Sequence, residues 1–152
     1  MGELPEGTHR IITRLDRDET RIVSGHAKIL AAALERDYMP RPPHHEPHHI
    51  VPATQCDSVG HCALARKILR DSDVDINQAD NGVWLPRTSI TSRTASIVQS
   101  DAATSHDNVH TRIYFAEIAR RLSQAFNSGG PNMVIPELHS IRWRLVQGNF
   151  PH

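Results

Sequence analysis

Residues 47–52 read PHHIVP, and this stretch decides how the rest of the sequence is interpreted. We expect a short strand over residues 48–51, ended by the proline that follows, and irregular structure over residues 40–47, where four prolines fall. Successive side chains of a strand point to opposite faces, so His48 and His49 are not expected to be equivalent ligands of one ion. The geometry favours a division of labour in which one imidazole holds a metal and the other addresses a water molecule.

A second short strand is predicted after the dipeptide Asn81-Gly82, which is a strong turn signal. Residues 83–85 read VWL, and Pro86 ends this apolar run as Pro52 ends the first one. On its own, an Asn-Gly pair indicates only a turn. Its position directly before a second strand bounded by proline makes Asn81 a candidate site residue.

A histidine pair near the predicted start of a helix is the third feature. Apolar periodicity predicts a helix over about residues 107–126. His106 and His110 are four residues apart, and positions with that spacing share one helical face, so two imidazoles can point at one ion. Taken alone, such a pair belongs more often to a solvated helix surface than to a metal site.

Three further helices are predicted from apolar spacing and end signals, over about residues 24–37, 57–71 and 136–148. The inward residues expected of the first two are Ile29, Leu30, Ala33 and Leu34, and Leu64, Ile68 and Leu69. Trp84 and Trp143 are most simply core or half-buried aromatics. Together with the two short strands, these elements predict an α+β domain that is mainly helical.

Length and composition exclude several classes of protein. The chain has 152 residues, and 17 Lys and Arg balance 17 Asp and Glu, which excludes a strongly basic nucleic-acid carrier. Two cysteines cannot build a disulfide framework. No apolar run is long enough for a membrane span or a signal core, so we expect a cytoplasmic protein or export without a cleaved signal. We expect a leader or hairpin over residues 1–23 and one domain over residues 24–152.

The order and spacing of five segments resemble the AHH family of the HNH/endonuclease VII superfamily. These segments are PHHIVP, LARKIL, DINQADNGVWLP, HDNVHTRIYF and LHSIRWRLVQGNFP, and they cover nearly the whole chain from about residue 30. The resemblance implies a small ββα-metal core and a metal-dependent endonuclease of the kind found at the toxic tip of bacterial polymorphic toxins. Pro47 stands where the family has alanine, at a position that only shapes the start of the strand.

The resemblance also implies a role for each candidate residue. His49 matches the general base, while His48 and His110 match metal ligands. Asn81 matches the superfamily asparagine that fixes the base imidazole or assists the metal site, and His106 matches a second ligand or a phosphate contact. These residue types suit phosphodiester hydrolysis, because imidazole titrates near neutrality and a divalent ion polarises the phosphate. A base imidazole also needs a fixed partner for its other N–H.

The cofactor expected from this resemblance is a divalent cation, Mg²⁺ or Zn²⁺, with Mn²⁺ and Ni²⁺ as further candidates. The expected partners are a nucleic-acid substrate, with DNA favoured over RNA, and a cognate immunity protein, without a membrane. Two alternatives stay open: an RNase of the same fold, and a catalytically silent module that binds metal or nucleic acid. The intact His48, His49, Asn81 and His110 favour the enzyme over the silent module.

Overall fold

The computed structural model describes residues 16–17, 20–21, 25–54, 60–87 and 111–152. Within these parts the protein is mixed α+β and mostly helical, with an antiparallel pair of strands at its centre, which confirms the predicted fold class. None of the helices in these parts is long and apolar enough to cross a membrane.

The central sheet consists of β3 (His45–His49) and β4 (Gly82–Pro86), paired antiparallel. The second strand lies where the sequence predicts it, but β3 begins three residues earlier than predicted and contains Pro47. A sheet of two strands leaves one edge of each strand without a ladder partner, so a proline without an N–H is tolerated there. Ile50 and Val51 follow the strand and are fully buried.

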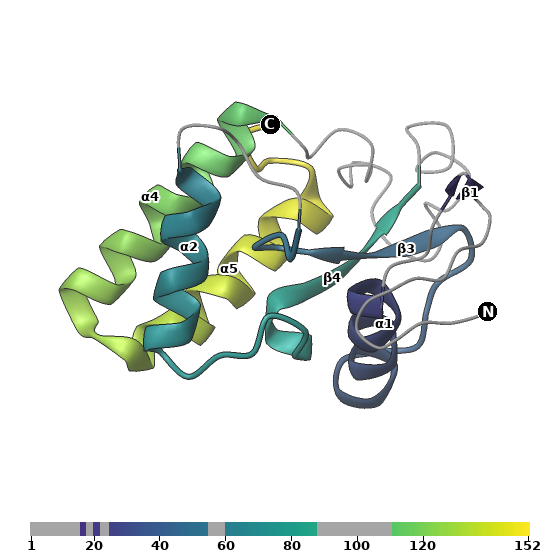
Figure 1. The fold of residues 1–152 in the computed structure, drawn as a ribbon, viewed down its shortest axis with the longest axis horizontal. Coiled ribbons are helices and arrows are strands. Elements are labelled where there is room, and N and C mark those ends of the chain that lie inside the picture. The colour runs from purple at the N-terminus through teal and green to yellow at the C-terminus, as the bar shows by residue number, and fades with distance from the viewer. Residues whose placement is uncertain (1–15, 18–19, 22–24, 55–59, 88–110) are drawn as a thin grey trace.

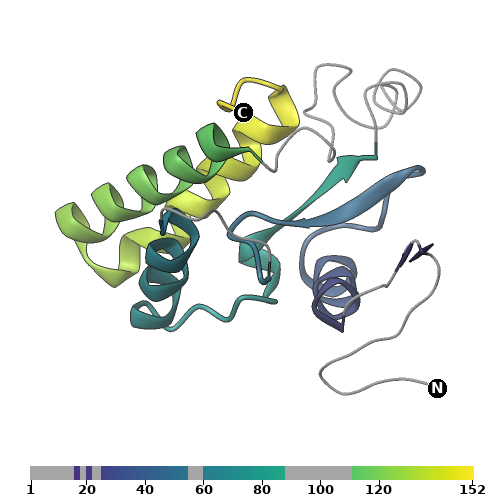
Figure 2. The ribbon, with the colours of Figure 1, turned by 45° about the horizontal axis from the view of Figure 1, so that its top comes forward.

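The helix α1 (Gly25–Asp37) covers one face of the sheet (Figures 1 and 2). Its Leu30 belongs to a small core with Trp84 of β4, and both side chains are fully buried. The helix packs closely at Gly82, where an added Cβ would lie 2.7 Å from Cδ1 of Leu30. The first residue of β4 therefore has to be small for α1 to pack in this position.

Three helices cover the opposite face: α2 (His61–Asp71), α4 (Arg112–Gly129) and α5 (Val134–Gln147) (Figures 1 and 2). They enclose the larger core, to which β4 contributes Val83 and Leu85. The fully buried helix residues of this core include Tyr114, Leu122, Val134, Leu138, Ile141 and Leu145. The sheet thus separates two cores, and successive residues of β4 face different ones.

Four helix boundaries differ from the prediction. The helix α2 begins about four residues later than expected, at His61, and α4 ends three residues later, at Gly129. The helix α4 begins five residues later than expected because Thr111 has an extended backbone, with φ −114° and ψ 160°, and caps the first turn through its side-chain oxygen. The helix α5 begins two residues earlier than expected, after the 3₁₀ helix η3 (Pro131–Met133). It ends as predicted at Gly148, which adopts φ 76°.

Three residues predicted to point inward are exposed instead. Ile29, Leu64 and Trp143 have exposed fractions of 56%, 45% and 64%. In α2 the buried side chains are those of Cys62, Ala65, Ile68 and Leu69, so the apolar stripe includes two small residues that hydrophobicity alone ranks below leucine. Small residues on the inward face let α2 approach its neighbours closely.

The described part of the N-terminal segment contains β1 (Asp16–Arg17) and β2 (Thr20–Arg21). They pair in parallel with an irregular register. Most of residues 1–23, including the expected domain boundary, lies outside the described residues, as does Ser24, where the first helix was expected to begin.

Candidate active site

The imidazoles of His48 and His49 point to opposite faces of β3, as the strand alternation predicts. His48 is 2% exposed, and its Nε2 lies 2.9 Å from the hydroxyl of Tyr114 on α4. That hydroxyl donates its proton to the carbonyl oxygen of Ile50, at 2.8 Å. The hydroxyl must therefore accept from Nε2–H of His48, and neutral His48 keeps its lone pair on Nδ1.

The Tyr114 phenol is well suited to hold this arrangement over a wide range of pH. Burial raises its pKa well above the ordinary value, and the nearby Cys62 thiol adds to the effect. The phenol consequently keeps its proton at every pH where the protein is expected to act. This pattern, a ligand-type histidine whose second nitrogen is held by a buried polar group, is typical of residues that orient metal-binding histidines.

On the other face of the strand, His49 is held by Asn77. Nε2 of His49 lies 2.8 Å from the side-chain oxygen of Asn77. An amide oxygen only accepts hydrogen bonds, so Nε2 carries the proton and Nδ1 keeps the lone pair. His49 therefore presents one nitrogen that can accept a proton, which is the arrangement a general base requires.

Asn77 is itself held through both its side chain and its backbone. Its nitrogen lies 3.1 Å from Nδ1 of His26 on α1, while its oxygen is farther from that atom, at 3.4 Å. Its backbone N–H donates to the carboxylate of Asp75 at 2.8 Å. The rings of His26 and His49 meet edge to face, with centroids 6.4 Å apart. Asn77, contacted by His26 on α1, thus fixes the tautomer of His49.

The side chain of Asn81 binds backbone groups of two segments. It ends the 3₁₀ helix η1 (Ala79–Asn81), it is fully buried, and its side-chain oxygen accepts from the backbone N–H of Val51 at 2.9 Å. Its nitrogen donates to the carbonyl oxygens of Val51 and Ile76, at 3.0 and 2.9 Å. Among the described residues, the side chain of Asn77 holds the imidazole of His49, and the roles expected of Asn81 stay predictions. Asn81 joins the end of β3 to the loop that carries Asn77.

The second half of the expected metal site falls outside the described residues, because both His106 and His110 lie in the segment 88–110. The helix α4 begins at Arg112, and the roles expected of His106 and His110 stay predictions. Among the residues that the structure does describe, no three His, Cys, Asp or Glu side chains gather as a metal-binding group.

The neighbouring pair His44 and His45 differs from the site histidines. His45 is 1% exposed, and its Nδ1 lies 2.9 Å from the carbonyl oxygen of Pro43. Its Nε2 is buried without a hydrogen-bond partner in the described parts of the chain. Burial lowers the pKa of His45. The hydrogen bond to Pro43 opposes this effect, and the charge of His44 adds to it. Its imidazole is therefore kept neutral.

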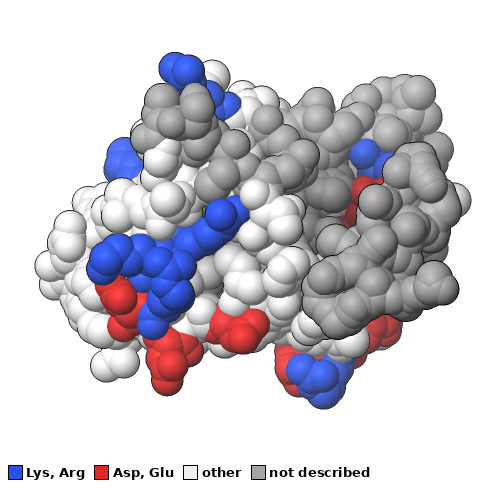
Figure 3. All heavy atoms as spheres, viewed as in Figure 1, with Lys and Arg blue, Asp and Glu red and all other residues white. Residues whose placement is uncertain are grey.

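Positive side chains gather on the exposed side of α2, as Figure 3 shows beside a row of acidic groups. They are Arg66, Lys67 and Arg70. Lys67 forms an ion pair with Asp71 at 2.6 Å, and Nε of Arg66 donates to the carbonyl oxygen of Pro52 at 2.7 Å. The zero net charge of the chain is thus compatible with a local positive surface.

Two functional residues were not found from the sequence. Asn77 is 28 residues from His49 in the chain, and its segment DINQ offers only an Asx-turn signal. Periodicity predicts only a buried ring at Tyr114, because the pattern does not show that its hydroxyl has a partner.

Comparison with known proteins gives one match. The model of a family described as AHH, a nuclease family of the HNH/ENDO VII superfamily with conserved AHH, matches residues 30–143. No curated protein and no solved structure matches the chain.

Proposed function

The chain belongs to the AHH nuclease family of the HNH/ENDO VII superfamily, and from this premise we propose that His49 is the general base of phosphodiester hydrolysis. The observation that carries the proposal is the hydrogen bond from Nε2 of His49 to Asn77, which leaves Nδ1 to accept a proton. Family membership makes the protein a phosphodiester hydrolase that acts on nucleic acid, with a ββα-metal core.

The proposed reaction begins when Nδ1 of His49 takes a proton from a water molecule. The water oxygen forms a bond to phosphorus as the bond to the leaving oxygen breaks, and the leaving oxygen is protonated by solvent. Asn77 stabilises the imidazolium that forms, because its oxygen accepts the hydrogen bond from Nε2–H of His49. Asn81 is a positioning residue in this proposal, since it holds the two segments that carry the base and its partner.

Nucleases of this superfamily typically use a divalent metal, and the described side of the site fits one. Nδ1 of His48 has the lone pair that a ligand needs, and the Tyr114 hydroxyl fixes the other nitrogen. We propose His48, His106 and His110 as the ligands, with Mg²⁺ or Zn²⁺ as the first ions to test and Mn²⁺ or Ni²⁺ after them. When bound, the ion supplies charge stabilisation for the phosphate and the leaving oxygen.

DNA is the proposed preferred substrate, with RNA as the second. An attacking water activated by His49 makes a 2′-hydroxyl unnecessary, so DNA is a chemically competent substrate. We also propose that the protein is a bacterial toxin domain with a cognate immunity protein, which rests on family resemblance. Expression of the wild-type chain in a bacterial cytoplasm should then reduce colony number, and a His49→Ala variant should not.

The decisive experiment is a digestion panel with plasmid DNA and structured RNA, in EDTA and after addition of single metals. The wild type should cleave only with metal, and His49→Ala should reduce the rate by about 10²–10⁴-fold while keeping the fold and most of the metal affinity. His139→Ala, which removes an exposed histidine on α5, is the matched control. Cleavage by His49→Ala within threefold of wild type would contradict the proposal. Nucleic-acid binding without cleavage under any metal would favour a silent module.

A further inference from the structure

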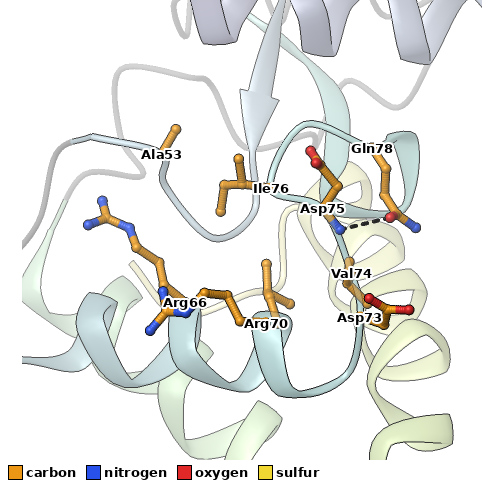
Figure 4. Close-up of a pocket in the computed structure, with 9 residues that line it drawn as sticks. Ala53, Arg66, Arg70, Asp73, Val74, Asp75, Ile76 and Gln78 are labelled. Atoms are coloured by element: carbon orange, nitrogen blue, oxygen red, sulfur yellow. Dashed lines mark hydrogen bonds between the residues drawn. The ribbon is translucent and has the colours of Figure 1, made fainter.

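A cavity of about 520 Å³ lies between α2 and the loop that follows it, next to the candidate active site (Figure 4). Its residues are Ala53, Arg66, Leu69, Arg70, Asp73, Val74, Asp75, Ile76 and Gln78. We call it the Arg–Asp pocket. Cavities of this size are typical of sites for small organic ligands.

The pocket is continuous with the segments that hold the base. Ile76 and Gln78 are the chain neighbours of Asn77, and Ala53 lies four residues after His49. Asn81 ties the two segments together through its bond to the carbonyl oxygen of Ile76. The loop that carries Asn77 therefore also forms one wall of the pocket.

One wall of the pocket is positive. Arg66 and Arg70 are one helical turn apart on α2 and share a face of that helix. The bond to the carbonyl oxygen of Pro52 holds Arg66 across the opening, and Figure 4 shows its side chain extending toward Ala53. Among the described residues, the guanidinium of Arg70 has no hydrogen-bond or ion-pair partner. An Arg fork of this kind is suited to bind a phosphate group.

The facing wall is acidic and polar. Asp75 and Gln78 stand on the loop opposite α2, joined by a 2.9 Å bond from the backbone N–H of Asp75 to the Gln78 side chain (Figure 4). One carboxylate oxygen of Asp75 accepts from the backbone N–H of Asn77. The carboxylate retains further acceptor capacity, because each of its two oxygens carries two lone pairs. The floor between the walls is apolar and includes Leu69, Val74 and Ile76.

We infer that the Arg–Asp pocket binds one nucleotide of the substrate, with its phosphate at Arg70 and its base edge at Asp75. The acidic wall would repel a ligand that carries only phosphate groups, because both are negative. The arginine wall would repel a cation, because both are positive. A nucleotide offers an anionic group, an apolar base face and N–H donors in one molecule. Guanine is favoured, because its N1–H and N2–H groups are parallel donors that match a carboxylate. Thymine presents a single N–H between two carbonyl oxygens, and the carboxylate repels these two oxygens.

This inference rests on the proposed function, but its test does not depend on cleavage. The full chain is titrated calorimetrically with 5′-dGMP and with 5′-dTMP in the absence of metal. We expect dGMP to bind at least fivefold more tightly than dTMP. Arg70→Gln should weaken both ligands by about tenfold, the size expected of one lost bidentate contact. Asp75→Asn should abolish the preference for dGMP, because it weakens the binding of dGMP and removes the repulsion of dTMP.

The variants are chosen to keep the fold. Asp75→Asn retains a side-chain oxygen for the Asn77 N–H, and Arg70 is on the exposed side of α2. Lys67→Gln removes the same charge from the same helix outside the pocket and should change neither affinity. Equal binding of the two nucleotides to the wild type, no saturable binding of dGMP, or an unchanged affinity in Arg70→Gln would each overturn the inference.

Sequencing of cleavage products gives a second measurement. The wild type should cut with guanine enriched at one fixed position relative to the scissile bond, and Asp75→Asn should lose that enrichment in the products that it still forms. Random product ends in the wild type would also overturn the inference. If the wild type binds dGMP but never cleaves nucleic acid, the proposed function fails and the nucleotide site stands.

Discussion

The side-chain oxygen of Asn77 lies 2.8 Å from Nε2 of His49, and this contact connects a loop residue to a strand residue 28 positions earlier in the chain. It sets the protonation state of the imidazole before any substrate binds, because the amide oxygen can only accept. The lone pair of His49 is thereby placed on Nδ1. Catalysis would then depend on a residue that touches neither substrate nor metal.

Replacement of Asn77 tests this dependence. Asn77→Ala should lower kcat/KM by about 10–100-fold, the usual cost of removing the partner of a functional histidine. Asn77→Asp keeps an acceptor but adds a negative charge, which favours the protonated imidazole and raises the pKa of His49. The acidic limb of the kcat/KM profile should therefore move to higher pH. The measurement is the pH dependence of cleavage at saturating metal.

His26 supplies the control for the Asn77 experiment. Its Nδ1 orients the Asn77 amide but does not contact His49 by a described hydrogen bond. His26→Ala should therefore lower kcat/KM by less than Asn77→Ala does and leave the shape of the pH profile unchanged. An identical pH profile in wild type and Asn77→Asp would show that Asn77 supports the fold and does not tune the base.

The phenol of Tyr114 is predicted to link stability and metal binding. Tyr114→Phe removes the partner of two buried groups, Nε2–H of His48 and the carbonyl oxygen of Ile50. The free energy of unfolding should fall by about 1–3 kcal/mol, and metal affinity by about 10–100-fold. Urea unfolding and calorimetric metal titration measure the two effects separately. Phe115→Leu, a packing change beside the same ring, should lower stability alone. An unchanged metal affinity in Tyr114→Phe would remove His48 from the ligand set.

Loss of a proposed metal-ligating histidine should reduce metal affinity and the rate of cleavage together. His48→Ala and His110→Ala should each weaken the binding of Zn²⁺ and Mg²⁺, and excess metal should restore part of the cleavage rate. Calorimetric titration of both variants against His139→Ala, the surface control, decides the point. If both variants bind metal as the wild type does, the ligands lie elsewhere, and His44 and His45 are the next residues to test.

The elements that periodicity describes well were predicted from the sequence, and their contacts were not. The helix α1 and the strand β4 follow from local patterns, because apolar spacing and proline report directly on burial and chain direction. The start of α4 was missed because Thr111 is compatible with a helix interior and with a cap, and only its extended backbone decides. Asn77 was missed because a hydrogen bond between distant segments depends on tertiary packing.

The last prediction concerns pH and the buried imidazole of His45. Burial lowers its pKa in the folded state from the ordinary value of 6.5. Below pH 6.5 the unfolded chain therefore binds more protons at this position than the folded one, so stability decreases as pH falls. The contribution of His45 to the free energy of unfolding is complete above pH 6.5, and it is lost as the pH drops through the folded-state pKa. Urea unfolding at pH 7.5 and pH 5.0 should show a smaller loss of stability for His45→Asn than for the wild type. His152→Asn changes a histidine at the exposed C-terminus and should follow the wild type. The same loss of stability in His45→Asn as in the wild type would mean that His45 does not titrate on unfolding.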